Sequence, residues 1–329
     1  MTVNSATPYA QLEPNVILAA IESLEFSCSG SLLPLNSYEN RVYQIGIEDA
    51  PPLIAKFYRP DRWSNEAIIE EHDFALELVS HEIPVIAPLI TNDQTLHTYQ
   101  EFRFALFPRK GGRALEIDNL EQLEWMGRFI GRLHAVGSCK PFHHRLHLNA
   151  NTYGYNPYQF LLEHDFIPIE IKEQYQIIVT SLLKKIDQYT NELTDLQIIR
   201  LHGDCHASNV LWSDSGPHIV DLDDCLMGPA IQDLWMLLPG TTSHEFESHL
   251  NCILQGYRAF HDFDKREIQL IEPLRTLRLI HYSAWLAKRW EDPTFPINFP
   301  WFGSSDYWKG QVDMLEEQTE AMQAPPLVA

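Results

Sequence analysis

The sequence predicts a protein of the α+β class with two lobes: a small N-terminal lobe rich in strands and a larger, mainly helical C-terminal lobe. In the first hundred residues, apolar and polar residues alternate in several short segments, the pattern of half-buried strands. Beyond residue 113, apolar residues recur at helical spacing. Between the two regions lies PRKGGR (108–113), whose glycines and charges predict a break in the structure.

Two adjacent strands are expected in the N-terminal lobe, at 41–47 and 53–58, with a turn at EDAPP between them. In the second strand Lys56 shares a face with Ile54 and Tyr58, so a charged side chain lies on a mostly apolar face. This lobe is also expected to contain a helix at about 64–80 and three short strands near 85–90, 95–100 and 102–107.

The C-terminal lobe is predicted to begin with a capped helix. Asp118 is the expected cap, because Glu121 follows three residues later as in a capping box. An apolar stripe at helical spacing is expected on this helix: Leu120, Leu123, Gly127, Ile130 and His134. Further helices are expected at 171–190 and 266–290. The break at 108–113 is the expected hinge, and such hinges commonly place a ligand cleft between two lobes.

Composition disfavours several classes of function. The chain has 24 Lys and Arg against 45 Asp and Glu, and a net charge of −21 repels nucleic acids and anionic membranes. The sequence has no apolar run of roughly 18 residues and begins without a secretory signal pattern. Five cysteines at irregular spacing fit reduced thiols better than a disulfide framework. We therefore expect a cytoplasmic protein with neither nucleic acid nor membrane as a partner. A monomer is also expected.

The stretch RLHGDCHASNVLW (200–212) carries polar side chains between apolar residues. After Asn209, VLW predicts a strand, SDSG a turn and HIVD a second strand, so that the hairpin returns Asp221 to the loop that carries Asp204. Two carboxylates and an amide oxygen then converge. Phosphoryl transfer needs this set: one Asp to accept or orient the attacking hydroxyl, and an Asn with a second Asp to hold Mg²⁺ against phosphates.

Two other interpretations of this loop stay open. His202, Asp204 and His206 could bind a transition metal in a hydrolase, although no third histidine follows at close spacing. The loop could also be purely structural, because Asn and Asp form turns. Hard oxygen ligands favour Mg²⁺, whereas zinc would prefer the imidazoles and Cys205. The sequence assigns no chemical role to His206.

The pattern HGDxHxxN (202–209), followed by IVD (219–221), resembles the aminoglycoside phosphotransferase and choline kinase superfamily, which has the protein-kinase-like bilobal fold. Segments along nearly the whole chain are similar to the bacterial stress response kinase A family: LNSYENRVYQI (35–45), AKFYRPDRW (55–63), VDLDD (220–224), GPAIQDLWMLL (228–238) and DPTFPINFPW (292–301). This resemblance implies a serine/threonine protein kinase of the stress response that uses ATP and Mg²⁺.

The resemblance also implies roles for single residues. Asp204 is expected to be the catalytic base, while Asn209 and Asp221 are expected to bind Mg²⁺, with Asp221 also counted as catalytic. Residues 1–108 would form the nucleotide-binding lobe, and 109–329 the catalytic and substrate lobe.

On the nucleotide side, Lys56 is expected to reach the ATP phosphates and to pair with a glutamate of the helix at 64–80. Glu71 is the predicted partner because it lies on the apolar face, whereas Glu70 lies on the acidic, solvated face. Ser37 lies in the segment expected to cover the phosphates, although that segment contains no glycine. Phe107 lies at the hinge, where adenine is expected.

Two further aspartates and one aromatic stretch have less specific predicted roles. Asp223 points the same way as Asp221 and could lie near the metal, and Asp233 is expected to brace the catalytic loop. The aromatic stretch FPINFPWF (295–302) is either part of the core or one wall of a substrate groove.

The substrate class is the least determined property. Only eleven residues separate Asp221 from Asp233, so the long activation segment of typical protein kinases is missing. That spacing resembles small-molecule kinases, and a kinase of an alcohol or amine metabolite is the alternative to a protein kinase. A non-catalytic nucleotide-binding module is a third possibility, against which the intact set Asp204, Asn209 and Asp221 argues.

Overall fold

The computed structural model describes residues 8–214, 216–238 and 244–324, and the predicted α+β class is confirmed. The chain forms two compact units, which do not correspond to two continuous stretches of sequence. Unit 1 is built from the residues up to 116, from 142–145 and from 206–225, and unit 2 from the rest of the chain. The functional division at residue 108 stays a prediction.

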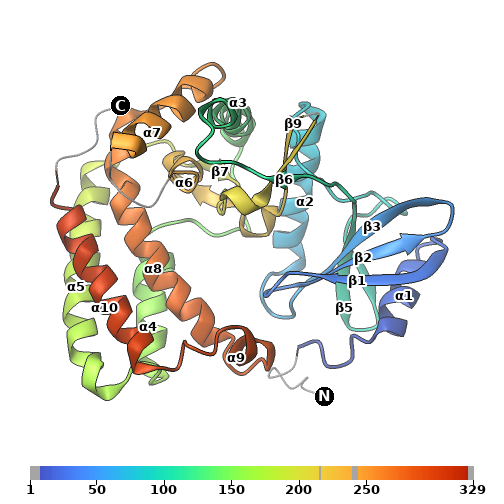
Figure 1. Ribbon diagram of the computed structural model, residues 1–329, viewed down its shortest axis with the longest axis horizontal. Helices are drawn as coiled ribbons and strands as arrows, with labels where there is room; N and C mark the ends of the chain where they lie inside the picture. The colour runs from blue at the N-terminus through green and yellow to red at the C-terminus, as the bar shows by residue number, and fades with distance from the viewer. Residues whose placement is uncertain (1–7, 215, 239–243, 325–329) are drawn as a thin grey trace. The chain divides into compact units, whose positions relative to one another are not determined.

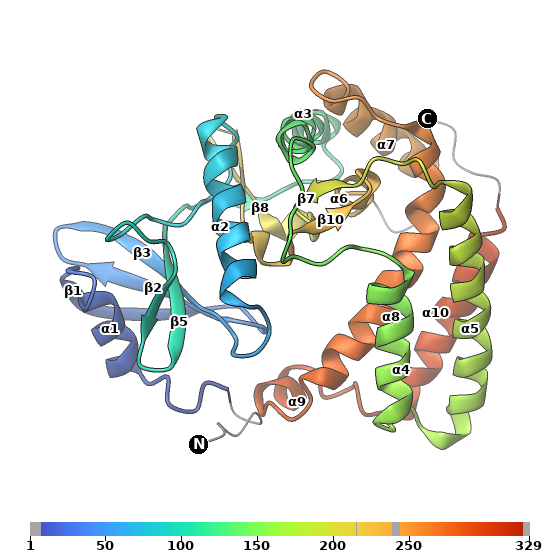
Figure 2. The ribbon, with the colours of Figure 1, turned by 180° about the vertical axis from the view of Figure 1, so that it is seen from behind.

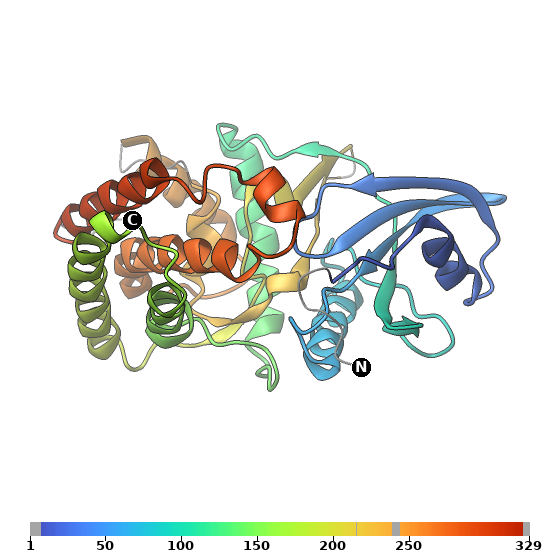
Figure 3. The same cartoon turned by 90° about the horizontal axis from the view of Figure 1, so that it is seen from below.

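Unit 1 contains an antiparallel five-stranded sheet (Figures 1 and 3). The order of its strands is β1-β2-β3-β5-β4. Its strands are β1 (Cys28–Leu35), β2 (Arg41–Ile47), β3 (Ala50–Phe57), β4 (His97–Tyr99) and β5 (Phe102–Pro108). The strand predicted at 85–90 is wrong: Val85 makes only an isolated parallel bridge to Ile219. Pro88 lacks a backbone N–H, which disfavours a strand there.

Two helices cover opposite faces of this sheet, and the alternation along β3 decides which side chains each helix meets. Ala55 and Phe57 pack in one apolar cluster with residues of α1 (Pro14–Glu22). Tyr58 packs on the other side with Ile68 of α2 (Asn65–Ser80). Lys56 lies on the α2 face of the sheet because it is two residues from Tyr58.

A second, three-stranded sheet of unit 1 has the order β6-β8-β9. Its strands are β6 (Arg113–Ala114), β8 (Val210–Ser213) and β9 (Gly216–Ile219). The hairpin of β8 and β9 confirms the one predicted from the sequence, with Val210 opposite Ile219. Ser215, in the predicted turn, lies outside the described residues. Two short 3₁₀ helices flank the hairpin, η2 (Ala207–Asn209) and η3 (Leu222–Asp224).

Unit 2 is mainly helical, as predicted for the C-terminal lobe (Figure 2). Its elements are α3 (Leu120–Gly137), η1 (Asn151–Tyr155), α4 (Asn156–Glu163), α5 (Ile169–Glu192), β7 (Ile199–Leu201), β10 (Leu226–Gly228), α6 (Ile231–Trp235), α7 (His244–Tyr257), η4 (Lys265–Leu270), α8 (Ile271–Lys288), α9 (Thr294–Asn298) and α10 (Ser305–Ala321). The strands β7 and β10 pair antiparallel. None of the described helices is long and apolar enough to cross a bilayer.

The first helix of unit 2 begins one residue later than predicted. Asn119, not Asp118, caps α3 by accepting hydrogen bonds from the backbone N–H groups of Glu121 and Gln122. Leu120, expected on the apolar stripe, is 43% exposed because it lies in the first turn, before the packed part of the helix.

Glycines let α3 and α7 pack at very short distance. A Cβ atom on Gly127 would lie 2.0 Å from the carbonyl oxygen of Ile253, and one on Gly256 would lie 2.0 Å from that of Glu124. Only a residue without a side chain fits such a contact. This packing fixes the end of α3 that carries His134 and the end of α7 that carries Tyr257.

The aromatic stretch near the C-terminus is largely core. Phe295 and Phe299 are 1% and 8% exposed and pack with Trp285 and other apolar residues of unit 2. Of the two interpretations of this stretch, packing in the core therefore holds for Phe295 and Phe299. Ile297 and Trp301, in contrast, are 76% and 42% exposed.

Candidate active site

The candidate catalytic loop follows β7 in unit 2. Asp233 holds it in place, because its two carboxylate oxygens accept hydrogen bonds from the backbone N–H groups of His202 and Gly203, both at 2.8 Å. Gly203 has a φ of +86°, a conformation that suits glycine. The side chain of Gln232 donates to the carbonyl oxygen of Gly203 at 3.1 Å. Asp233 thus braces the loop as predicted.

Asp233 is itself held by a buried pair of side chains. His134 Nε2 is hydrogen-bonded to its carboxylate at 3.0 Å, and His134 Nδ1 is hydrogen-bonded to the hydroxyl of Tyr257 at 2.9 Å. Both His134 and Tyr257 are fully buried. The close packing of α3 on α7 therefore supports the loop through three successive side chains.

Asp204, the predicted base, is half-buried at the end of this loop. Its backbone N–H donates to His202 Nδ1 at 3.3 Å, so His202 also supports the loop. Its carboxylate oxygen Oδ1 accepts from Arg278 Nη1 of α8 at 2.8 Å. His206, for which no chemical role was assigned, caps η2 by accepting from the backbone N–H of Ser208 at 3.2 Å.

The predicted magnesium ligands lie together in unit 1, at the open end of the β8–β9 hairpin. The backbone N–H of Val220 donates to the carbonyl oxygen of Asn209 at 3.0 Å, which brings the neighbouring Asp221 beside Asn209. Asp221 has a left-handed backbone, with φ 63° and ψ 67°. Such a conformation is uncommon outside glycine and occurs often at functional sites. The side chain of Asp221 is 55% exposed.

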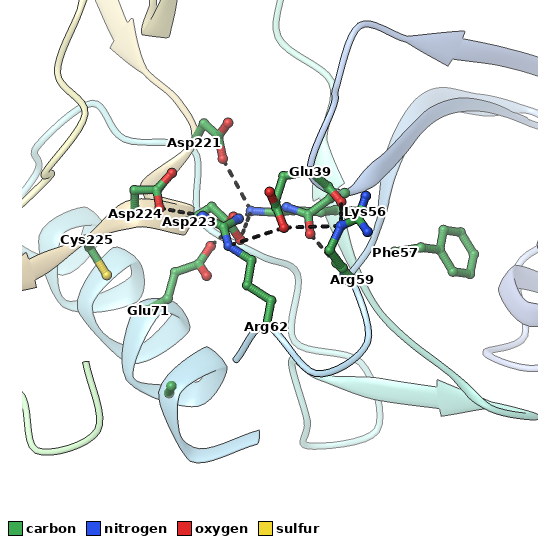
Figure 4. A network of polar contacts seen from close by, with 12 residues as sticks. Glu39, Lys56, Phe57, Arg59, Arg62, Glu71, Asp221, Asp223, Asp224 and Cys225 are labelled. Atoms are coloured by element: carbon green, nitrogen blue, oxygen red, sulfur yellow. Dashed lines mark hydrogen bonds and ion pairs between the residues drawn. The ribbon is translucent and has the colours of Figure 1, made fainter. Parts of the chain in front are cut away.

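Lys56 pairs with Glu71, as predicted, and with two further carboxylates (Figure 4). Its Nζ atom lies 3.3 Å from Glu71 Oε1, 3.3 Å from Asp221 Oδ1 and 2.9 Å from Asp223 Oδ1. The side chains of Lys56, Glu71 and Asp223 are all buried. Asp223 therefore faces the lysine, and it pairs with Arg62 as well.

Two arginines for which the sequence predicted no role complete this network. Arg62 contacts Asp223, Asp224 and Glu39, and Figure 4 shows its guanidinium among these carboxylates. Arg59 contacts the Glu39 carboxylate at 3.1 Å. Glu39 belongs to the segment expected to cover the phosphates, so the two arginines anchor one end of that segment to the loop after β3 and to the residues after Asp221.

Burial and neighbouring charges shift the pKa values of this network. Burial raises the pKa of Glu71 to about 7, although Lys56 opposes the shift. Burial acts in the same direction on Asp223, but the adjacent cations, Arg62 first, outweigh it and hold its pKa well below the usual range. Burial lowers the pKa of Lys56, but the surrounding carboxylates, Asp223 foremost, outweigh it, so the lysine stays charged.

Glu70 makes structural hydrogen bonds, although its place on the acidic face of the helix predicted a solvated side chain. Its carboxylate accepts hydrogen bonds from the backbone N–H groups of His143, His144 and Arg145, at 2.6, 2.8 and 3.1 Å. The segment 142–145 belongs to unit 1 although its neighbours in sequence belong to unit 2. Glu70 therefore fixes this segment to α2.

Ser37 and Phe107 are the other two residues predicted to contact the nucleotide. Ser37 is half-buried in the loop between β1 and β2. Phe107 lies in β5 opposite Ile54, on the same face of the sheet as Lys56, and its ring packs edge-on against His72 of α2. No motif of the sequence indicated a role for Tyr9. Its hydroxyl donates to the carbonyl oxygen of Glu39 at 3.2 Å, beside the Ser37 loop.

The sequence contained signals for some of the missed residues. Arg59 and Arg62 both lie in AKFYRPDRW (55–63), and three aspartates crowd VDLDD (220–224). Buried carboxylates need cationic partners, so the crowding of aspartates was itself a reason to look for arginines. Nothing in the sequence indicated that Arg278 meets Asp204.

No group of three or more His, Cys, Asp and Glu side chains within 8–214, 216–238 and 244–324 is arranged to hold a metal ion.

Comparison with known proteins shows the family to which the chain belongs. The model of the phosphotransferase enzyme family matches residues 31–290, and the chain belongs to that family. Stress response kinase A of Escherichia coli O157:H7 is 46% identical over 324 residues, with 98% of each chain covered. Serine/threonine protein kinase RdoA of Salmonella typhimurium is also 46% identical over 98% of each chain. Within the phosphotransferases, the chain is thus a kinase of the stress response kinase A family.

Solved structures show the same fold at low sequence identity. Amicoumacin kinase hAmiN matches with a TM-score of 0.71 and 18% identity over 94% of both chains. A microcompartment-associated aminopropanol kinase matches with a TM-score of 0.69 and 17% identity over 93% of this chain and 98% of the other. The protein-kinase-like fold implied by the sequence is therefore confirmed, with a β-rich N-lobe and a helical C-lobe.

Proposed function

We propose that this kinase transfers the γ-phosphoryl group of ATP to serine or threonine hydroxyls of proteins, with Mg²⁺ as cofactor, in the cytoplasm and as part of a stress response. The observation that carries the proposal is the contact of Lys56 with both Glu71 and Asp221. The kinase mechanism requires a strand lysine paired with a helix glutamate, next to the aspartate that binds the metal.

The donor set at the hairpin end fits Mg²⁺. Asn209 and Asp221 offer amide and carboxylate oxygens, the hard ligands that Mg²⁺ prefers, and Mg²⁺ commonly takes only one or two protein ligands besides water and phosphate oxygens. Asp221 is accessible, because its side chain is 55% exposed. Asn209 and Asp221 would hold the ion, which would supply charge neutralisation at the phosphates.

Asp204 would act on the acceptor. Its carboxylate would take the proton of the attacking hydroxyl while the hydroxyl oxygen forms a bond to the γ-phosphorus. The bond between that phosphorus and the bridging oxygen breaks, and ADP leaves with the electron pair. Lys56, together with Ser37 and the segment anchored by Glu39, would contact the nucleotide phosphates, and Phe107 would lie near adenine.

A kinase of a small alcohol or amine is the second candidate, and the chain after Asp221 favours it. The residues between Asp221 and Asp233 pass directly through η3 and β10 into α6, with no inserted segment that could support a peptide. The amicoumacin and aminopropanol kinases, which share the fold, are named after small molecules. The 46% identical relative named as a serine/threonine protein kinase favours the first candidate.

The test of the activity is Mg²⁺-dependent transfer of labelled phosphate from ATP, with Asp204→Ala and Asp221→Ala as variants. Asp204→Ala should lower turnover at least about 100-fold and still bind ATP, because the base is not a nucleotide ligand. Asp221→Ala should lose the Mg²⁺ dependence of nucleotide binding. Asp214→Ala, exposed at the other end of the same hairpin, is the control and should match the parent protein. Near-normal turnover of Asp204→Ala would rule out its role as the base.

The two candidate substrate classes differ in the surface they need. A protein acceptor requires an exposed anchor, and Ile297 and Trp301 provide apolar surface beside the core of α8 and α9. Ile297→Ser with Trp301→Ala should impair transfer to a protein and leave ATP affinity intact. Ile169→Ser, 84% exposed on α5, is the matched control. Turnover of a metabolite far above that of any protein would establish the second candidate instead.

A further inference from the structure

Arg278, on α8, places a positive charge at the proposed base. Its Nη1 atom lies 2.8 Å from Asp204 Oδ1, and its side chain is 44% exposed. Both residues belong to unit 2. The surface on which an acceptor hydroxyl must approach Asp204 therefore includes an accessible guanidinium.

The loop does not need Arg278 for its shape. Asp233 holds the backbone of His202 and Gly203, and Gln232 holds the carbonyl group of Gly203. These contacts are buried, whereas the contact of Arg278 is exposed. Other residues thus already hold the loop in its shape, so Arg278 is not needed for that purpose.

Most hydrogen-bond donors of Arg278 remain available. Besides Asp204, its one other polar contact among the described residues is with the sulfur of Met236, at 3.8 Å from Nη1. Arg275, one turn earlier on α8, is different: it is held by Glu272 at 3.6 Å and covers the ring of Trp235. A guanidinium has five N–H donors, so Arg278 can bind a second anion while it lies next to the base.

We propose that Arg278 selects acceptors with an anionic group beside the phosphorylated hydroxyl, a carboxylate or a phosphate, and discriminates against acceptors with an ammonium group there. The planar guanidinium binds either anion through two parallel hydrogen bonds, whereas it repels a cation. This inference rests on the proposed function, because it takes Asp204 as the base. The acceptor's anion binds the remaining donors of Arg278 while Asp204 takes the hydroxyl proton, as the hydroxyl oxygen bonds to the γ-phosphorus and ADP leaves.

The test uses peptides of one length with a single acceptor serine, which differ only in the neighbouring residue: glutamate, phosphoserine, glutamine or lysine. We measure kcat and KM for each peptide with the parent protein and with Arg278→Gln, Arg278→Lys and Lys288→Gln. The glutamate and phosphoserine arms separate the two sources of negative charge. Lys288→Gln removes the same charge from the far end of α8 and is the control.

The parent protein should prefer the glutamate or phosphoserine peptide over the glutamine peptide by about tenfold in kcat/KM, and the lysine peptide should be the poorest. Arg278→Gln should abolish this order, mainly through KM. Arg278→Lys should retain a weaker preference, because an ammonium lacks the fork, and Lys288→Gln should retain all of it. An unchanged order in Arg278→Gln overturns the proposal. An equal loss of kcat with every peptide also overturns it, since Arg278 would then act on the base or the phosphoryl group.

A failure of the proposed protein substrate is distinguishable from a failure of this inference. If no peptide is phosphorylated, the same variants are assayed with two three-carbon alcohols, 3-hydroxypropanoate and 3-aminopropan-1-ol. A preference for the carboxylate that Arg278→Gln abolishes supports the charge selection while rejecting a protein acceptor. A preference for the amine, or transfer to neither alcohol, rejects the charge selection. Melting temperatures of all variants confirm folding.

Discussion

Glu70 and Glu71 are adjacent in α2 but differ in every contact, so their substitutions should have different effects. Glu71→Gln removes the charge that orients Lys56 and should reduce turnover. Glu70→Gln should leave turnover near normal but lower the free energy of unfolding by about 1–2 kcal/mol, because three backbone N–H groups lose a charged acceptor. Steady-state kinetics and urea titration measure the two effects.

The control for both changes is Asp73→Asn, an exposed position of the same helix. It should alter neither turnover nor unfolding. If Glu70→Gln reduced turnover as much as Glu71→Gln, the segment 142–145 would have to take part in nucleotide binding.

Glu267 should make stability depend on pH. Burial raises its pKa from 4.5 to about 7, although the backbone N–H of Ile231 donates to the carboxylate at 2.8 Å. Between these pH values the unfolded chain is ionised while the folded protein retains the proton. This group therefore lowers stability progressively as pH rises from 4.5 to about 7, by roughly 3 kcal/mol at most.

Glu267→Gln removes the titration and keeps a hydrogen-bond acceptor for Ile231. The melting temperature of the variant minus that of the parent protein should be more positive at pH 8 than at pH 5. Thermal melts at the two pH values measure the difference. An equal shift at both would mean that Glu267 is ionised in the folded protein throughout this range.

At the scale of elements, the packing of α3 on α7 depends on glycine. Gly127→Ala would place a Cβ atom 2.0 Å from a backbone oxygen and should lower the free energy of unfolding by about 1–3 kcal/mol or more. Gly310→Ala, in α10, meets no atom within 4 Å and should raise it by about 0.5–1 kcal/mol. Denaturant titration compares the two. Equal effects would show that α7 shifts away from α3 without cost.

The elements that the sequence predicted well are those determined by local pattern. The hairpin after Asn209 and the helix from about 64 to 80 depend on short-range periodicity and on turn and cap residues, and both are present. The cap at Asn119 was missed by one residue, because Asp and Asn serve equally well as caps. The strand expected at 85–90 is not formed, because the alternation of apolar and polar residues does not by itself provide a neighbouring strand to pair with.

Contacts between distant residues could not be predicted in the same way. Asp204, Asn209 and Asp221 are close in sequence, so their motif could be recognised directly. Arg62 and Asp223 are 161 residues apart, and Arg278 and Asp204 are 74 apart. No periodicity connects such pairs, because they meet only through the packing of whole elements. The partner of Lys56 was predictable because the helix face left one buried carboxylate in need of a cation.

At the scale of the whole molecule, the path of the chain has a consequence for its synthesis. The segment 206–225, which carries the carboxylates Asp221 and Asp223, completes unit 1 about a hundred residues after that unit's first part ends at 116. A ribosome needs roughly 5–20 s to add that length of chain. During this interval Lys56, which the finished protein buries, has only one of its three acidic partners, Glu71, available. The new chain therefore exposes an unfinished charge cluster, a state in which chaperones and proteases can act on it.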